Sequence, residues 1–315
     1  MVYYEDEMNN IAEDVPCMVI MRLFGGLGNQ LFQYAYGRQL ALNKNVMLKL
    51  DITSGFRGDY YERKYSLDYF NIVENIADKK DLPHLLFAHT ESPTIMGKLS
   101  RMINSFVLKS NPVIILEANT SKDKIIDSQY DDLYLVGYWQ DEKYFHSIRK
   151  ILMNEMSLKV KLNNTSEIIA ENIKRSNSVA IHYRNYTKKN RHYIFQRPDR
   201  HGILEEAYYT RAVNYICSHI ENPYFYVFSD DEEMALEKFN YEVPHTVVTH
   251  NKNSFYEDLI LMSMCRHQII ANSSFSWWSA WLNKNENKIV IAPLQWFSNS
   301  RYSSKDIILP SWIKL

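Results

Sequence analysis

Apolar residues follow two different patterns along the first fifty positions of the chain. Residues 18–24 form a β-rich apolar run, and after a glycine turn at 25–28 apolar side chains recur at helical spacing from Phe32 to Leu40. A second apolar run follows at 46–50. A strand, a helix and a strand in this order predict a βαβ unit, from which parallel sheets are built.

The middle of the chain is less regular. Residues 52–130 mix tyrosine, lysine, aspartate and proline with weak periodicity, which indicates loops and short helices. A strand is expected at 134–138 and a helix at 141–156. The pattern loosens near 159–165, which suggests a boundary between two domains.

The second half alternates strands and helices more clearly. Strands are expected at 179–184, 224–229, 246–249, 267–271 and 288–292. Helices are expected at 204–218, at 254–265 and from 273 onward. Ser254 and Glu257 have the spacing of a capping box for the second of these helices. Three tryptophans on the third helix are expected in the core, namely Trp277, Trp278 and Trp281.

The sequence thus predicts an α/β fold of two successive Rossmann-like domains with a short leader. Residues 1–16 carry five acidic residues and no apolar run, which is typical of a flexible leader and unlike a signal peptide. We place the N-terminal domain at 17–160 and the C-terminal domain at 161–315. No run of ~18 apolar residues occurs, so no transmembrane segment is expected.

Composition and charge narrow the class of partner. The chain has 36 Lys and Arg residues and 37 Asp and Glu residues, for a formal net charge of −1. A nucleic-acid binder needs a basic face, so no nucleic-acid partner is expected. The three cysteines show neither zinc spacing nor a disulfide framework, so no metal site is expected. The absence of a disulfide framework favours a location in the reducing cytoplasm.

The glycine turn is the first candidate binding feature. Glycine lets the backbone approach a ligand closely, and the following helix offers free N–H groups to an anion. Gly26 and Gly28 also fit part of a dinucleotide fingerprint, in which Asp51 would bind a ribose, although Leu31 replaces the third glycine. An NAD-dependent oxidoreductase is therefore one alternative, and a tight turn without a ligand is another.

Polar residues follow two of the predicted strands. His182 and Arg184 lie on one face at the end of their strand, where open α/β sheets bind ligands, and an arginine there can bind a phosphate with two hydrogen bonds. The alternative is an arginine paired with a structural acid beside a histidine at the edge of the core. Asp230 and Asp231 end the next strand, where a carboxylate can bind a guanine edge or cap a helix.

A third polar cluster, at 272–275, lies between a predicted strand and a predicted helix. Asn272, Ser273 and Ser274 can bind an anion through side chains and backbone N–H groups, or they can simply cap the helix. The chain contains no D-x-D triplet, which disfavours a metal-bound diphosphate.

Several of these stretches together resemble glycosyltransferase family 11, the α-1,2-fucosyltransferases of bacteria and animals. The matching stretches are GGLGNQLFQYAYGRQLA, HYR, FSDD, DLILMSMCRHQIIANSSFSWWSAWLN and PLQW, and the resemblance spans roughly residues 18 to 300. It implies a GT-B-like fold whose two Rossmann-like domains face a central cleft, with the acceptor on the N-terminal side and the donor on the C-terminal side. It further implies inverting transfer of L-fucose from GDP-β-L-fucose to the 2-hydroxyl of a terminal β-galactoside, without a metal or other cofactor.

The resemblance also implies partners and site residues. The acceptor would be a galactose-terminated oligosaccharide or glycolipid, and the enzyme could work peripherally at the inner face of a membrane. Arg184 would contact the β-phosphate and Asn29 would lie beside the reacting carbon, with His182 as the third catalytic residue. The donor-binding residues would be Gly26, Gly28, Arg184, Asp230, Asn272, Ser273, Ser274 and Phe275.

Two points stay open at this level. Asp51 and Glu205 are both candidates for the general base. The family usually reads H-x-R-R-G-D-Y, whereas Asn185 and Thr187 stand here in place of the second arginine and the aspartate. Because of this departure, a glycan-binding module with an inactive donor site remains an alternative to an enzyme.

Overall fold

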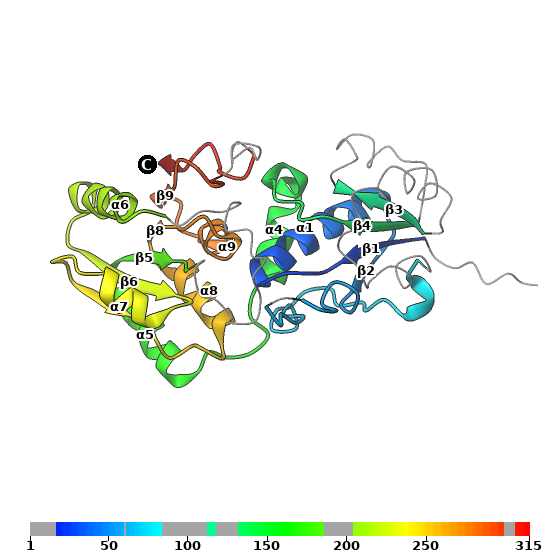
Figure 1. Cartoon of the computed structure of the whole chain (residues 1–315), viewed down its shortest axis with the longest axis horizontal. Helices are drawn as coiled ribbons and strands as arrows, with labels where there is room; N and C mark the ends of the chain where they lie inside the picture. The colour runs from blue at the N-terminus through cyan, green and yellow to red at the C-terminus, as the bar shows by residue number, and fades with distance from the viewer. Residues whose placement is uncertain (1–16, 60, 84–111, 118–131, 186–203, 299–305) are drawn as a thin grey trace, which may run out of the picture.

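The structure contains two parallel sheets, each formed by one half of the chain (Figure 1). It is a computed structural model, and it describes residues 17–59, 61–83, 112–117, 132–185, 204–298 and 306–315. The predicted leader at 1–16 lies outside the described residues. The predicted boundary at 160/161 falls in the connection between the last helix of the first half and the first helix of the second, and it stays a prediction.

The first half forms a four-stranded parallel sheet in the order β2-β1-β4-β3. Its strands are β1 (Met18–Arg22), β2 (Met47–Asp51), β3 (Val113–Leu116) and β4 (Leu133–Val136). β3 falls within 52–130, where we expected no strand, because four isolated apolar residues carry no period of their own.

The helix α1 (Leu27–Lys44) connects β1 to β2, as the apolar spacing predicts. The helix ends at Asn45, which takes a left-handed conformation with φ of +55°. The Asn45 N–H group donates to the carbonyl oxygens of Ala41 and Leu42. The strand-helix-strand prediction is therefore confirmed.

The second half forms a six-stranded parallel sheet in the order β10-β9-β8-β5-β6-β7. Its strands are β5 (Asn177–Tyr183), β6 (Pro223–Ser229), β7 (His245–Val247), β8 (His267–Ile269), β9 (Val290–Ala292) and β10 (Ile313–Lys314). Its helices are α5 (Asn164–Arg175), α6 (Glu206–His219), α7 (Glu232–Lys238), α8 (Phe255–Met264) and α9 (Ser274–Leu282).

Two local predictions need correction. The helix expected at 141–156 is two 3-10 turns, η4 (Glu142–Tyr144) and η5 (His146–Ile148), followed by the short helix α4 (Arg149–Glu155). A further 3-10 turn, η1, spans Lys79–Asp81. The prediction of a capping box at the start of α8 is wrong. Ser254 makes no side-chain cap, and the Glu257 carboxylate instead accepts hydrogen bonds from Asn163.

The two halves share a core of aromatic side chains. Phe32 of α1 packs against Trp277 and Trp278 of α9, with ring centroids 4.5 and 5.0 Å apart. Phe145 stacks on Trp278 at 5.4 Å and also contacts Phe32, with ring centroids 6.0 Å apart. The predicted burial of the tryptophans is confirmed, and α9 thereby fixes the second half against α1 (Figure 1). Within the described residues, no helix is both long and apolar enough to span a membrane.

Candidate active site

The carboxyl ends of β8, β5 and β6 bring three of the predicted motifs side by side. β5 pairs with β8 so that Ile181 lies opposite Ile269, which places Arg184 and Asn272 at the same level beyond the strands. β5 pairs with β6 so that Tyr183 lies opposite Ser229, which brings Asp230 beside Arg184. This edge of a parallel sheet is where α/β proteins bind ligands.

The first turns of α1 and α9 meet at this edge. A Cβ atom added to Gly28 would lie 2.4 Å from the carbonyl carbon of Ser274 and 2.6 Å from the backbone nitrogen of Phe275. Gly28 is therefore needed for the close approach of two backbones. Its predicted donor-binding role stays a prediction, but the helix contact explains this glycine without a ligand.

Asn29 lies in the first turn of α1, partly buried. Its Oδ1 accepts a hydrogen bond of 2.9 Å from the Gln140 side chain. Gly25 beside it has a φ of +79°, and a Cβ there would lie 2.8 Å from Asn29 Nδ2. The turn thus needs Gly25 for both backbone conformation and space.

His182 is 3% exposed and packs at the end of β5, with its ring centroid 5.7 Å from that of Phe275. Among the described residues its Nδ1 has no hydrogen-bond partner. Burial lowers the pKa of His182 to about 3, with help from the positive charge of Arg184. The ring is therefore neutral near pH 7, with one nitrogen available for a ligand hydrogen bond.

Arg184 is paired with Asp230, with Nη1 and Oδ2 2.8 Å apart and each side chain 29% exposed. Asp230 also accepts the backbone N–H of Asn185, whose side chain donates to Asp231 at 2.9 Å. The structure thus contains the arginine–acid pair that we considered as an alternative to phosphate binding. Thr187 lies outside the described residues, whereas Asn185 links the two acidic residues after β6.

The serine cluster partly serves as a helix cap. Ser273 accepts the N–H of Phe275 at 3.3 Å, which confirms the capping interpretation for this residue. Asn272 is 1% exposed and donates to the Trp296 carbonyl oxygen at 3.3 Å. Ser274 and Phe275 are half-buried in the first turn of α9.

Asp51 lies 1% exposed with both carboxylate oxygens engaged. Its oxygens accept hydrogen bonds from the backbone and hydroxyl groups of Thr53 and Ser54 and from the hydroxyl of Tyr134. Burial raises the pKa of Asp51, but these hydrogen bonds outweigh it and hold the pKa below its ordinary value. A buried, fully bonded carboxylate is a poor general base and a poor ribose ligand, so the geometry disfavours both interpretations of Asp51.

Glu205, the other candidate base, is exposed at the residue before α6 and makes no side-chain cap there. Its predicted role as the base stays a prediction.

Arg63 lies beside the glycine turn, and the sequence analysis did not single it out. Its Nε would lie 3.9 Å from a Cβ atom on Gly26, so the guanidinium lies over the start of α1. Its segment falls within 52–130, where no periodic pattern draws attention to a single arginine. The one available signal was its position shortly after Asp51.

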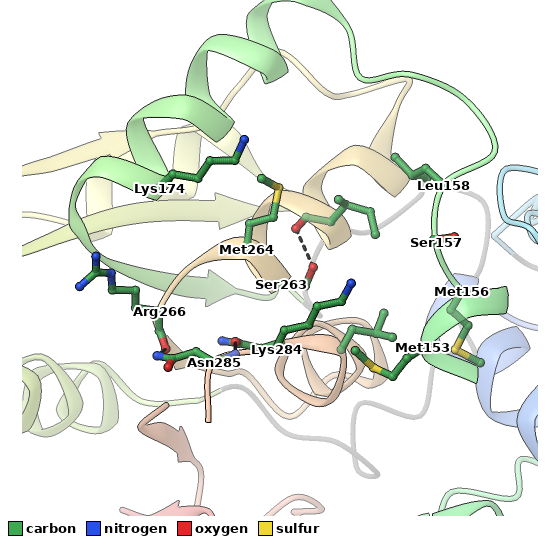
Figure 2. A pocket seen from close by; sticks show the side chains of 13 residues that line it. Met153, Met156, Ser157, Leu158, Lys174, Ser263, Met264, Arg266, Lys284 and Asn285 are labelled. Atoms are coloured by element: carbon green, nitrogen blue, oxygen red, sulfur yellow. Dashed lines mark hydrogen bonds between the residues drawn. The ribbon is translucent and has the colours of Figure 1, made fainter. Parts of the chain in front are cut away.

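A separate cavity of about 390 Å³ lies away from these residues (Figure 2). Its lining includes Met153, Met156, Ile260, Met264, Leu282 and Lys284. These residues lie in or directly after α4 and α9 and in the second half of α8, at the opposite end of α9 from Ser274. None of the predicted site residues lines it. In the described part of the chain, no group of three or more His, Cys, Asp or Glu side chains is placed to hold a metal ion.

Solved structures share this fold. The fucosyltransferase NodZ from Bradyrhizobium aligns with a TM-score of 0.53 and 13% identity, over 84% of this chain and 91% of that one. A structure of NodZ alpha-1,6-fucosyltransferase soaked with GDP-fucose gives a TM-score of 0.51 at 12% identity, over 84% and 92%. The predicted GT-B-like α/β fold is therefore confirmed.

Sequence relatives extend over nearly the whole chain. An Alpha-1,2-colitosyltransferase from Escherichia coli is 32% identical over 304 residues, which cover 95% of this chain and 99% of the relative. The O-antigen biosynthesis glycosyltransferase WbnK from Escherichia coli is 29% identical over 317 residues, which cover 93% and 99%. The family model described as Glycosyl transferase family 11 matches residues 115–315. The chain therefore belongs to glycosyl transferase family 11 and is a glycosyltransferase.

Proposed function

We propose that this glycosyltransferase transfers L-fucose from GDP-β-L-fucose to the 2-hydroxyl of a terminal β-galactoside, with inversion and without a metal ion. The observation that carries the proposal is the position of Arg184 at the end of β5, level with Asn272 and beside the start of α9. The names of two similar proteins support it. One is an Alpha-1,2-colitosyltransferase, and the other is the NodZ alpha-1,6-fucosyltransferase, whose structure was obtained after soaking with GDP-fucose.

The chemistry requires positive groups at the leaving phosphate. When the bond between the sugar and GDP breaks, negative charge develops on the β-phosphate, and fixed donors in a partly dry cleft stabilise it. Arg184 and the N–H groups at the start of α9 can supply these donors. Asp230 holds the Arg184 guanidinium in place, and it also neutralises part of the charge before the donor arrives.

The acceptor hydroxyl would attack from the opposite face of the sugar, so a β-linked donor gives an α-linked product. Asn29 in the first turn of α1 would orient the sugar, and the free nitrogen of neutral His182 would accept or donate one hydrogen bond. Since Asp51 is fully bonded, we propose a dissociative path with weak base assistance, in which Glu205 is the one base candidate left from the sequence. The acceptor would be a galactose-terminated oligosaccharide or glycolipid.

A GDP-release assay with GDP-fucose and a panel of β-galactosides, with and without a chelator, tests the proposal. Arg184→Ala should lower turnover ~10²- to 10³-fold, the usual cost of losing one such donor. The control is Arg175→Gln, which changes an exposed arginine on α5 and should leave turnover unchanged. Wild-type turnover in folded Arg184→Ala would refute the assignment, and glycan binding without GDP release would favour a binding module. Loss of activity with the chelator would refute the metal-free mechanism.

A colitosyl donor is a second candidate, because a relative named as a colitosyltransferase is 32% identical over 95% of this chain. Colitose is L-fucose without the 3-hydroxyl group. A site that hydrogen-bonds this hydroxyl rejects the deoxy sugar strongly, whereas an apolar site does not. Comparing kcat/KM for GDP-fucose and GDP-colitose decides between the two donors.

A further inference from the structure

The segment that carries Arg63 is fixed to the start of α1 by buried hydrogen bonds. Gln30 is fully buried, and its side chain donates to the carbonyl oxygens of Gly25 and Lys64 and accepts the N–H of Ser66, each at 2.9 Å. The Asp59 carboxylate accepts the backbone N–H of Arg63 at 3.0 Å. Arg63 is therefore held on both sides, directly beside the glycine turn.

The guanidinium of Arg63 has a defined place within this segment. It lies 4.0 Å from the centroid of the Tyr61 ring, in a cation–π arrangement, and over Gly26 at the first turn of α1. The first turn of α1 in turn contacts the first turn of α9 through Gly28 and Ser274. Arg63 thus belongs to the N-terminal half but lies where the two halves meet.

Among the described residues, the charge of Arg63 is offset in part by the Asp59 carboxylate and by no ion pair. The ion pairs of the described residues do not include Arg63, and the nearby Asp59 carboxylate is engaged by backbone N–H groups. Burial lowers the pKa of Arg63, and the positive charge of Arg184 lowers it further, while Asp59 opposes them. The charge of Arg184 thus acts on Arg63 although the two residues belong to opposite halves of the chain.

We propose that Arg63 is a second cation for the diphosphate of the nucleotide-sugar donor and binds its β-phosphate from the side opposite Arg184. An anion between the two guanidinium groups replaces their repulsion with two attractions, and the partial positive charges at the starts of α1 and α9 act in the same direction. The inference rests on the proposed function, since it assumes that the donor is a nucleoside diphosphate sugar. It also gives the N-terminal half a direct part in holding the donor.

GDP and GMP binding by calorimetry tests the inference, with wild type, Arg63→Gln, Arg63→Lys and the control Arg175→Gln. A hydrogen bond to a charged group contributes about 1.5–3 kcal/mol, so Arg63→Gln should weaken GDP binding roughly 10- to 100-fold. GMP lacks the β-phosphate, and its binding should change less than about 3-fold. Arg63→Lys keeps the charge and should recover part of the GDP affinity.

The outcomes separate this inference from the proposed function. If wild type binds neither GDP nor GMP, the proposed function fails. If wild type binds GDP and Arg184→Ala weakens it, but Arg63→Gln with an unchanged melting temperature binds GDP as wild type does, the inference alone is overturned. Equal losses for GDP and GMP would also overturn it. Should Arg63→Gln melt early, Arg63→Lys gives the decision. A lower affinity than wild type for GDP but not for GMP supports the inference, and wild-type affinity for both overturns it.

Discussion

Replacing Gly28 with alanine should separate the first turns of α1 and α9. The added Cβ atom would lie 2.4 Å from the Ser274 carbonyl carbon, whereas ordinary contacts begin at 3.4 Å, so the backbones must move apart by about 1 Å. Overpacking of this kind costs about 1–3 kcal/mol, and alanine in a helix offsets roughly 0.5–1 kcal/mol of that cost. We expect a net loss of stability of about 1–2 kcal/mol.

The displacement should also reduce turnover, because Ser273 and Ser274 begin α9 at the candidate site. A misplacement of 1 Å can cost ~10²-fold in rate. Differential scanning calorimetry should show a melting temperature lower by roughly 2–8 °C, and the GDP-release assay should show the loss in kcat/KM.

Gly37→Ala provides the matched control within the same helix. Its Cβ atom would meet side chains of Leu48 and Met21 at 3.1 to 3.3 Å, and these can shift by a few tenths of an ångström. Gly37→Ala should therefore keep wild-type activity and lie within roughly 1 kcal/mol of wild-type stability. Wild-type stability and kcat/KM in Gly28→Ala would show that the two helices do not approach as closely as described, and would refute the reasoning.

Three further predictions concern buried ionisable groups. Asp51→Asn should destabilise the protein by roughly 1–3 kcal/mol in denaturant unfolding at pH 7, because an amide cannot accept all the hydrogen bonds of the carboxylate. Since the folded state lowers the pKa of Asp51, the wild-type protein should lose this stability as the pH falls below about 4. A loss of turnover with unchanged stability in Asp51→Asn would instead support Asp51 as the base. Burial raises the pKa of Asp258 to about 7, against the hydrogen bond from Asn251, so the folded state holds the proton more tightly and stability should fall as the pH rises from about 4 to about 7. Asp258→Asn should remove most of the difference between the free energies of unfolding measured at pH 5 and at pH 8. An unchanged difference would contradict this prediction. His182, with a pKa of about 3, should show no change of its ring NMR signals between pH 5 and 8, and a titration in that range would contradict its burial as a neutral ring.

Strands and helices with a clear period could be predicted from the sequence, and irregular segments could not. The helix α1 and the strands β5 and β6, which end at Tyr183 and Ser229, follow from local apolar spacing within each segment. β3 was missed because its four residues become a strand only by pairing with β4. The helix predicted at 141–156 was shortened because its first turns pack as 3-10 turns around buried Phe145.

The candidate site divides in the same way. The motifs of Asn29, Arg184, Asp230 and Ser273 were identified from residue type and from their places after strands. The bonded state of Asp51 was not, because its partner Tyr134 lies 83 residues away. Arg63 was not found either, because Gln30 fixes its segment through bonds to positions 34 and 36 residues further along the chain.

The sequence alone determined that alternating strands and helices form parallel sheets, that their carboxyl ends carry the polar motifs, and which family the chain resembles. These properties depend on local periods and short motifs, which need no knowledge of distant contacts. Only the tertiary structure decided that Gly28 serves the contact between α1 and α9, that Asp51 is fully bonded, and that Arg63 lies over Gly26 at the start of α1. The physical reason is that burial, hydrogen bonding and charge pairing depend on residues far apart in the chain that folding brings together.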